Sequence, residues 1–354
     1  MKVALLGLAQ SGKKTFFSLL TGKKSATPIV LKEGESLEGI ASIYDPRVVA
    51  LADLFKPECT KFADNIIVLC PDVAEGDGVP AKVGKRPWLE AARKCDLLCM
   101  VVRAFTTAEV YHPKGVVDAE RDRSFLEAEC LLADLETIEN RLARMAKEKR
   151  SGQTAQQVQE EHSLVKIKEI LEREMKWTAF NLAPHELEPI KSLNLLSLKP
   201  LLWAYNVDEN ALASDPAGPQ NNMFKVSCRI EQEIMALDSI EERQAYLKDL
   251  GVSASGLDRL NQAAYDTLGL MSFYTVGKDE VRAWTIHKGT AAPAAAGKVH
   301  SDIERGFIRV ETIKFDDLMA AGSEAAAKAQ GKSQVKGRDY IIENGDVCHF
   351  RFNV

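Results

Sequence analysis

The N-terminal stretch Val3-Ala4-Leu5-Leu6-Gly7-Leu8-Ala9-Gln10-Ser11-Gly12-Lys13 decides the fold of this chain. Its apolar residues 3–6 predict a buried strand, and residues 13–21 predict a helix. The glycine-containing turn between them ends in Gly12-Lys13, in the context that a phosphate-binding P-loop requires. Backbone N–H groups of such a loop surround a phosphate, and the helix N-terminus and the lysine add positive charge. The stretch therefore predicts an α/β nucleotide-binding fold; the alternative is an ordinary strand-to-helix turn.

The residue after Lys13 departs from the P-loop pattern. A serine or threonine normally binds Mg²⁺ there, whereas this chain has Lys14, and Thr15 follows. One residue turns a side chain by roughly 100° around a helix, so Thr15 is poorly placed as a substitute ligand. Either the Lys14 ammonium neutralises phosphate charge itself, or Lys14 points into solvent and the loop binds nothing. The expected phosphate site comprises Ala9, Gln10, Ser11, Gly12, Lys13, Lys14 and Thr15.

Four more apolar runs predict further strands. They lie at residues 66–69, 97–102, 201–205 and 224–226, and helical segments separate most of them. Together with residues 3–6 they predict a mostly parallel sheet that helices cover on both faces.

A heptad pattern interrupts this alternation between the third and the fourth run. The apolar residues at spacings of four and three are Leu131, Leu135, Ile138, Leu142 and Met145. The polar residues 149–153 break the pattern, and a second amphipathic segment then continues to about Met175. We therefore expect an antiparallel coiled-coil hairpin at residues 117–191, inserted into the α/β domain of residues 1–116 and 192–276. The pair is either a projecting arm that contacts a large partner or a packed helical subdomain.

The last part of the chain, from about residue 277, has a different character. Its strand-like runs lie at residues 281–286, 306–313, 340–342 and 347–352, with turn signals such as Asn344-Gly345-Asp346 between them. This pattern predicts a small α+β domain at residues 277–354.

The composition agrees with a folded protein of more than one domain. The 354 residues are 45% hydrophobic and 27% charged, which excludes disorder and collagen-like repeats. The seven cysteines are scattered and predict reduced thiols. We find no signal peptide pattern and no 18-residue apolar span, so we expect a cytoplasmic protein without membrane association. The net charge of −5 argues against indiscriminate nucleic-acid binding but leaves open a basic face on one domain.

Short segments of the C-terminal third carry a family resemblance. They include Asp279-Glu280-Val281-Arg282-Ala283-Trp284, Glu304-Arg305-Gly306-Phe307-Ile308-Arg309 and Gly345-Asp346-Val347-Cys348-His349-Phe350. Further matching segments at residues 45–47, 56–58, 101–105, 199–200 and 256–260 extend the pattern over essentially the whole chain. The chain resembles the YchF / Obg-like ATPase family. The resemblance implies a P-loop NTPase of the Ras-like G-domain type with a coiled-coil insertion and a C-terminal TGS domain, a ubiquitin-like β-grasp module associated with RNA and ribosome contacts.

The resemblance also assigns the base-recognition residues. In this family Asn-x-x-Glu replaces the Asn-Lys-x-Asp element of GTPases, a change associated with ATP, and here the element is Asn206-Val207-Asp208-Glu209. Ser227-Cys228 falls at the base-side loop. The resemblance therefore implies that Asn206, Val207, Glu209, Ser227 and Cys228 bind a nucleotide, with ATP preferred over GTP. Without the resemblance, the element at residues 206–209 could be a polar turn after a strand.

The hydrolytic residues are less complete. His112 aligns with the histidine that the family is thought to use in place of the GTPase glutamine, where it could orient the attacking water. By itself it could equally be an ordinary loop residue. Leu69 occupies the position of the metal-side aspartate, so Asp72 is the substitute metal ligand beside Thr15, and Glu33 replaces the threonine that senses the γ-phosphate. The groups Glu75 and Asp77 could help Asp72 to rebuild the site.

The resemblance and its departures together give two functional expectations. In the first, the protein binds ATP, with a doubtful Mg²⁺ site, and is at most a slow ATPase assisted by His112. Its nucleotide state would then orient the helical arm and the TGS-like domain for a ribosome or RNA partner. In the second, the protein is a nucleotide-independent RNA- or ribosome-binding adaptor on a degenerate NTPase scaffold. ATP should raise the melting temperature only in the first case.

Overall fold

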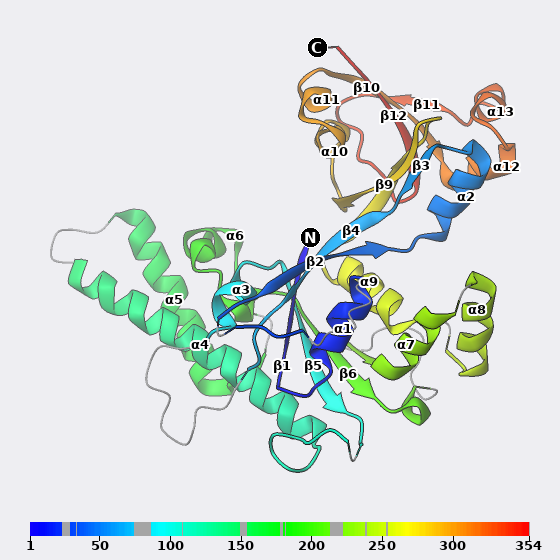
Figure 1. The fold of residues 1–354 in the computed structure, drawn as a ribbon. Helices are drawn as coiled ribbons and strands as arrows, with labels where there is room; N and C mark the ends of the chain where they lie inside the picture. The colour runs from blue at the N-terminus through cyan, green and yellow to red at the C-terminus, as the bar shows by residue number, and fades with distance from the viewer. Residues whose placement is uncertain are drawn as a thin grey trace. The chain divides into compact units, whose positions relative to one another are not determined.

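The computed structural model of the chain describes residues 1–22, 29–32, 34–73, 86–107, 109–148, 154–177, 180, 182–212, 222–237, 239–252 and 254–353. The chain divides into two compact units. Unit 1 comprises Met1–Ile40 and Ile66–Leu260, and unit 2 comprises Ala41–Asn65 and Asn261–Val354. The strands form two six-stranded sheets, so the fold is mixed α/β (Figure 1). Within the described ranges, no helix is long and apolar enough to cross a membrane.

The first sheet has the strand order β2-β4-β1-β5-β6-β7. Its strands are β1 (Lys2–Gly7), β2 (Leu37–Ile43), β4 (Ala63–Leu69), β5 (Leu97–Ala104), β6 (Leu201–Val207) and β7 (Met223–Val226). The pairs β1–β4, β1–β5, β5–β6 and β6–β7 are parallel. This confirms the parallel sheet that the five apolar runs predict. The apolar runs do not include β2, because this edge strand mixes polar and apolar residues around Gly39.

Unit 1 also contains several shorter helices. They include α1 (Lys13–Leu20), α3 (Leu89–Arg93), α6 (Pro184–Leu187), α7 (Cys228–Ala236), α8 (Ile240–Asp249) and α9 (Gly256–Thr267), whose last residues belong to unit 2. Short 3₁₀ turns lie at Glu188–Leu193, Leu196–Leu198 and Glu209–Ala211. Trp88, Met100 and Trp203 are buried together in the core beneath the sheet.

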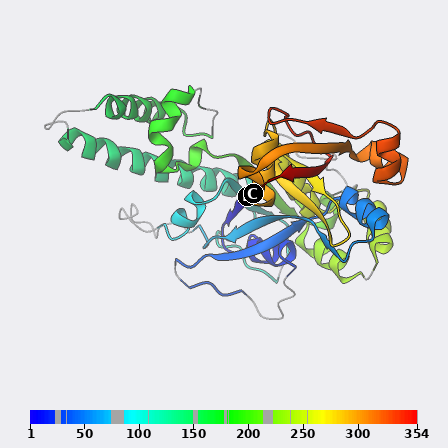
Figure 2. The same cartoon turned by 90° about the horizontal axis from the view of Figure 1, so that it is seen from above.

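Two long helices of unit 1, α4 (Ala119–Glu148) and α5 (Ala155–Glu174), run side by side (Figures 1 and 2). Heptad residues of both helices form one buried cluster, which includes Leu131, Ile138, Met145, Leu164, Ile167 and Leu171. Arg141 of α4 donates two hydrogen bonds, of 2.6 and 2.8 Å, to Glu160 of α5. The predicted turn at residues 149–153 lies outside the described residues.

The second sheet has the order β11-β10-β12-β8-β9-β3. Its strands are β3 (Cys59–Lys61), β8 (Leu270–Thr275), β9 (Glu280–His287), β10 (Phe307–Lys314), β11 (Gln334–Lys336) and β12 (Asp346–Phe352). The helices of unit 2 are α2 (Pro46–Phe55), α10 (Ala292–Val299), α11 (Ser301–Arg305), α12 (Phe315–Ala321) and α13 (Glu324–Ala329). Two clusters of buried apolar side chains hold these elements together.

Three sequence-based expectations for this region differ from the structure. The predicted boundary at residue 277 cuts unit 2, because β8 pairs with β9 and with β12. Residues 41–65, which we expected in the α/β domain, also belong to unit 2, where the Tyr274 hydroxyl donates a 2.5 Å hydrogen bond to Asp45 Oδ2. The strand predicted at residues 340–342 is wrong: the segment forms a single bridge between Ile341 and Ala291.

Candidate functional site

The turn between β1 and α1 has the backbone shape that the P-loop motif predicts. Gln10 and Gly12 adopt left-handed conformations, with φ of 61° and 89°. A Cβ atom at Gly12 would lie 2.1 Å from Asn206 Nδ2, so this position requires glycine both for its φ and for space. α1 begins directly afterwards, since the Phe16 N–H donates to the Gly12 carbonyl at 2.9 Å.

Asn206 connects three of the predicted segments. It lies at the end of β6 and is only 4% exposed. Its Nδ2 donates to the Ser11 carbonyl at 3.1 Å, and its Oδ1 accepts from the Cys228 N–H at 3.1 Å. The P-loop, the end of β6 and the start of α7 therefore meet at one amide side chain. Ser227 and Cys228 are buried at this junction, and burial raises the pKa of the Cys228 thiol, which stays protonated.

The other residues of the Asn206–Glu209 element lie apart from the P-loop contact. Val207 is buried in an apolar cluster behind β6. Asp208 Oδ2 accepts from the backbone N–H and the hydroxyl of Thr106, at 3.0 and 3.2 Å. Glu209 is exposed at the start of a 3₁₀ turn. Asp208, which the sequence did not single out, thus ties the end of β6 to the segment that follows β5.

A cavity of about 800 Å³ opens beside the P-loop. Its walls come from the loop, from α1, from residues 29–30, from α7 and from Asp72. They include Ala9, Gln10, Ser11, Gly12, Lys13, Lys14, Thr15, Ser18, Ile29, Val30, Asp72, Gln232, Met235 and Ala236. The volume is typical of a site for a nucleotide-sized ligand. The predicted residues Asn206, Val207, Glu209, Ser227 and Cys228 do not line it among the described residues. Sequence reasoning missed Gln232, Met235 and Ala236, although their spacing places them on one face of the helix after Ser227-Cys228.

Lys13 belongs to the cavity wall, but its ammonium is buried and bonded to protein oxygens. Its side chain is 2% exposed and donates to the carbonyls of Cys70 and Pro71, at 2.8 and 3.0 Å. Asp72 Oδ1 lies 3.0 Å from the same ammonium. Burial lowers the pKa of Lys13, and the charge of Asp72 opposes this effect. The ammonium also donates to the Gly7 carbonyl at 3.4 Å, so a phosphate that contacts Lys13 must compete with four oxygen partners.

The predicted metal ligands do not fit Mg²⁺ in this arrangement. Asp72 pairs with the Lys13 ammonium, and the exposed side chain at the usual serine or threonine position is Lys14. Thr15 is partly buried on the cavity wall. Within the described ranges, no group of three or more His, Cys, Asp or Glu side chains is arranged to hold a metal ion. Glu33, Glu75 and Asp77 lie outside those ranges.

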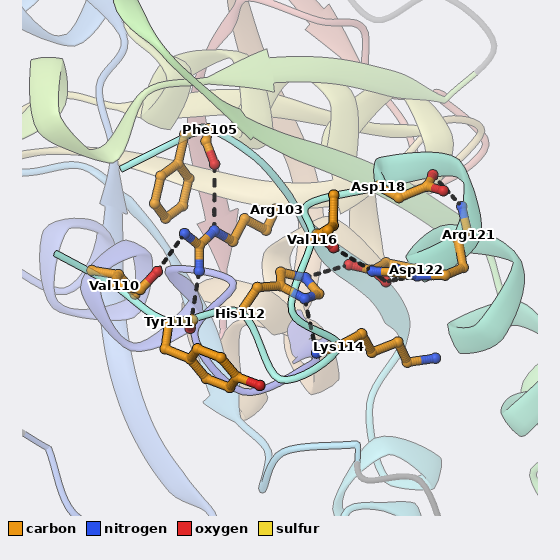
Figure 3. Close-up of polar contacts among 10 residues, drawn as sticks. All are labelled: Arg103, Phe105, Val110, Tyr111, His112, Lys114, Val116, Asp118, Arg121 and Asp122. Atoms are coloured by element: carbon orange, nitrogen blue, oxygen red, sulfur yellow. Dashed lines mark hydrogen bonds and ion pairs between the residues drawn. The ribbon is translucent and has the colours of Figure 1, made fainter. Parts of the chain in front are cut away.

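His112 lies between β5 and α4 and is 3% exposed (Figure 3). Its Nδ1 accepts from the Lys114 N–H at 3.1 Å, so the ring proton is on Nε2, which donates to Asp122 Oδ2 at 2.8 Å. His112 and Asp122 line a narrow interior gap with Leu8, Ala9 and Ser11, and neither is among the residues described in the wall of the larger cavity. The sequence predicted a histidine near the P-loop but not its burial or its partner.

Comparisons with known proteins cover the whole chain. A family model, YchF-GTPase_C, described as a protein of unknown function, matches residues 270–353. The "Ribosome-binding ATPase YchF" of Bacillus subtilis is 37% identical and matches over 100% of both chains. The "Obg-like ATPase 1" of Caenorhabditis elegans is 33% identical over 100% of this chain and 92% of that protein. The solved YchF GTPase of Schizosaccharomyces pombe superposes with a TM-score of 0.81 at 28% identity, covering 99% of this chain and 97% of the other.

Proposed function

The chain belongs to the YchF / Obg-like ATPase family, and we propose that it is an ATP-binding P-loop protein that associates with ribosomes. The observation that carries the nucleotide part is the junction at Asn206, which joins the P-loop to α7 beside a cavity of about 800 Å³. The ribosome part rests on the B. subtilis relative, which is named for ribosome binding.

The residues of the cavity suit a polyphosphate ligand. The left-handed turn at Gln10 and Gly12 lies at the N-terminus of α1, where backbone N–H groups favour an anion. Lys14 adds an exposed ammonium to the wall. We assign base contacts to the wall of Gln232 and Met235 and to the end of β6. The exposed Glu209 stands where guanine-binding proteins have aspartate, and on this basis we assign ATP rather than GTP.

Hydrolysis, in this proposal, is slow, and the enzyme is at most a weak ATPase. ATP supplies its own reactive phosphate, while the chain positions it and neutralises its charge. The neutralising groups here are ammonium groups, Lys13 and Lys14, and one oxygen of Asp72 is already paired with the Lys13 ammonium. Because a metal ion contributes several kcal/mol to charge stabilisation at such sites, we expect rates orders of magnitude below those of a magnesium-dependent NTPase. We assign to His112 the orientation of the attacking water.

The remaining modules are assigned from family membership. We propose that α4, α5 and their neighbours in residues 117–191 form a coiled-coil arm, and that unit 2 contains the TGS-like β-grasp module. Both would contact the ribosome or its RNA, in the cytoplasm. Basic side chains of unit 2 that could face RNA include Arg282, Lys288, Lys298, Arg305 and Arg309.

Calorimetric titration of ATP tests the proposal. Wild-type protein and Lys14→Ser are titrated with and without Mg²⁺, and GTP is used as a competitor. We expect wild-type protein to bind ATP without Mg²⁺, and Lys14→Ser to need the ion. The absence of heat in both proteins would refute nucleotide binding.

A second function has one observation in its favour, the internal engagement of Lys13. In this second function the protein is a nucleotide-independent adaptor that binds ribosomal RNA. In that case ATP would leave the melting temperature unchanged, while sedimentation with ribosomes would be independent of nucleotide.

A further inference from the structure

His112 is held in a position in which it cannot serve a water molecule. Both ring nitrogens already have protein partners, Lys114 N–H on Nδ1 and Asp122 on Nε2 (Figure 3). A histidine that orients a nucleophile needs one nitrogen free to accept or donate a hydrogen bond to it. With 3% of its surface exposed, the ring also lacks access to solvent.

Asp122, in the first turn of α4, is the residue that keeps the ring there. Its carboxylate is buried and fully used: Oδ2 accepts from His112, and Oδ1 accepts from Nε and Nη2 of Arg121 at 3.0 and 2.9 Å. The Arg121 guanidinium balances the charge of this carboxylate. A hydrogen bond to such a charged acceptor is among the stronger ones in a protein.

The segment around His112 is attached at both of its ends. Arg103 of β5 donates to the carbonyls of Val110 and Tyr111, at 2.8 and 3.3 Å, and its guanidinium lies 4.5 Å from the centre of the Phe105 ring. Arg121 of α4 donates to the Val116 carbonyl at 2.8 Å. The His112 ring itself has two printed hydrogen bonds, from the Lys114 backbone N–H and to Asp122, and the bond to Asp122 is the one that connects the ring to α4.

The burial pattern of this segment is inverted. The polar His112 is buried, whereas the apolar side chains on either side, Tyr111 and Val116, are 73% and 72% exposed. A buried polar group beside exposed large apolar groups is the informative departure from the usual distribution. The segment can reverse this pattern by turning His112 outward, and the only ring bond to a side chain that this breaks, among the described contacts, is the one to Asp122.

We propose that Asp122 is a positioning residue that holds His112 withdrawn from the phosphate cavity, and that this hydrogen bond must break before His112 can reach a bound nucleotide. The proposal rests on the hydrolytic role assigned to His112 above. It makes the first turn of α4, the helix of the arm, the element that restrains hydrolysis. A movement of α4 would then release His112.

Steady-state ATP hydrolysis tests the direction of the effect. In Asp122→Leu the acceptor is lost from a side chain of the same branching, and Arg121, one third exposed, can turn to solvent. We expect hydrolysis to rise at least about tenfold, because a hydrogen bond to a charged group shifts an equilibrium by roughly one to two powers of ten. Asp118→Asn is the matched control: Asp118 accepts from the Arg121 N–H but does not contact His112, and its rate should equal that of wild type. The double variant with His112→Ala should fall to the rate of His112→Ala alone.

A rate in Asp122→Leu equal to or below that of wild type overturns the proposal, since Asp122 would then orient His112 for catalysis or serve packing alone. If thermal melts show that Asp122→Leu is unfolded, Asp122→Asn replaces it. The single oxygen of the asparagine amide can accept a hydrogen bond from His112 or from Arg121, but not from both. We therefore expect a smaller rise in the rate of ATP hydrolysis in Asp122→Asn than in Asp122→Leu.

Chemical modification in the absence of nucleotide tests whether the hydrogen bond to Asp122 keeps His112 buried. Diethyl pyrocarbonate acylates accessible, unprotonated imidazole nitrogens, and mass spectrometry locates the product. We expect His112 to be protected in wild type and Asp118→Asn and modified at least about tenfold faster in Asp122→Leu. Equal reactivity in wild type and Asp122→Leu overturns the proposal. By contrast, an unchanged hydrolysis rate in His112→Ala refutes only the hydrolytic role in the proposed function.

Discussion

Replacing Glu231 by glutamine should stabilise the protein at alkaline pH and have little effect at acidic pH. Glu231 lies on α7, next to the cavity wall, and is 4% exposed. Its Oε1 accepts the Gly256 N–H at 2.6 Å, whereas Oε2 has no hydrogen-bond partner in the described part of the chain. Burial raises the pKa of Glu231 from its ordinary 4.5 to about 7, although the bond from Gly256 opposes the rise.

The sign and the size of the effect follow from this shift. Between pH 4.5 and about 7 the folded protein binds more protons at Glu231 than the unfolded chain does, so stability falls as the pH rises through this window and is constant above it. At roughly 1.4 kcal/mol per unit of pKa, the buried charge costs at most about 3 kcal/mol at pH 8. Glutamine reproduces the protonated acid and keeps the acceptor for Gly256. We therefore expect Glu231→Gln to raise the melting temperature at pH 8 by several degrees, given about 2–4 °C per kcal/mol for a domain of this size.

Thermal melts between pH 5 and pH 8.5 measure this effect. Glu169→Gln is the matched control, because Glu169 is exposed on α5 and the substitution is the same. We expect the control to follow wild type at every pH. A melting temperature of Glu231→Gln that is equal to wild type at pH 8, or lower, would refute the reasoning, as would a gain of the same size at pH 5.

Three further predictions concern the cavity and the helix pair. Gly12→Ala should abolish ATP binding in calorimetry, because its Cβ would lie 2.1 Å from Asn206 Nδ2, whereas Gly22→Ala, with nothing within 4 Å of the new Cβ, should bind as wild type. Asp72→Asn should tighten ATP binding without Mg²⁺ by roughly tenfold, since it removes a charged competitor for Lys13; weaker binding would contradict the competition. Glu160→Gln should destabilise the α4–α5 pair by about 1 kcal/mol and speed hydrogen exchange in α5, while Glu169→Gln leaves exchange unchanged.

The sequence predicts those parts of the site that depend on local backbone chemistry. A left-handed turn favours glycine whatever surrounds it, and the apolar run before Gly12 is typical of a buried strand, so the P-loop could be placed from residues 3–13 alone. The heptad spacing likewise marked the packing face of α4, because a helical period is a local property.

Other features depend on partners that are distant in the sequence. The burial of His112 comes from Asp122 on the next helix, and the engagement of Lys13 comes from the carbonyls at the end of β4. Residues 41–65 fold with the C-terminal unit through contacts such as that between Asp45 and Tyr274. Local sequence patterns do not predict such contacts. For the same reason, the sequence does not predict that Asn206 also links Ser11 to Cys228.

Two carboxylates engage the two groups that the proposed activity needs most. Asp72 lines the cavity and pairs with Lys13, and Asp122 binds His112 outside the described cavity wall. The first contact competes with a phosphate and should change affinity, whereas the second withdraws a hydrolytic group and should change rate. If the two act independently, the variant that combines Asp72→Asn with Asp122→Leu should show the affinity of the first and the rate increase of the second, because effects at sites without shared partners add. Non-additive changes would instead mean that Lys13 and His112 move together when a nucleotide binds.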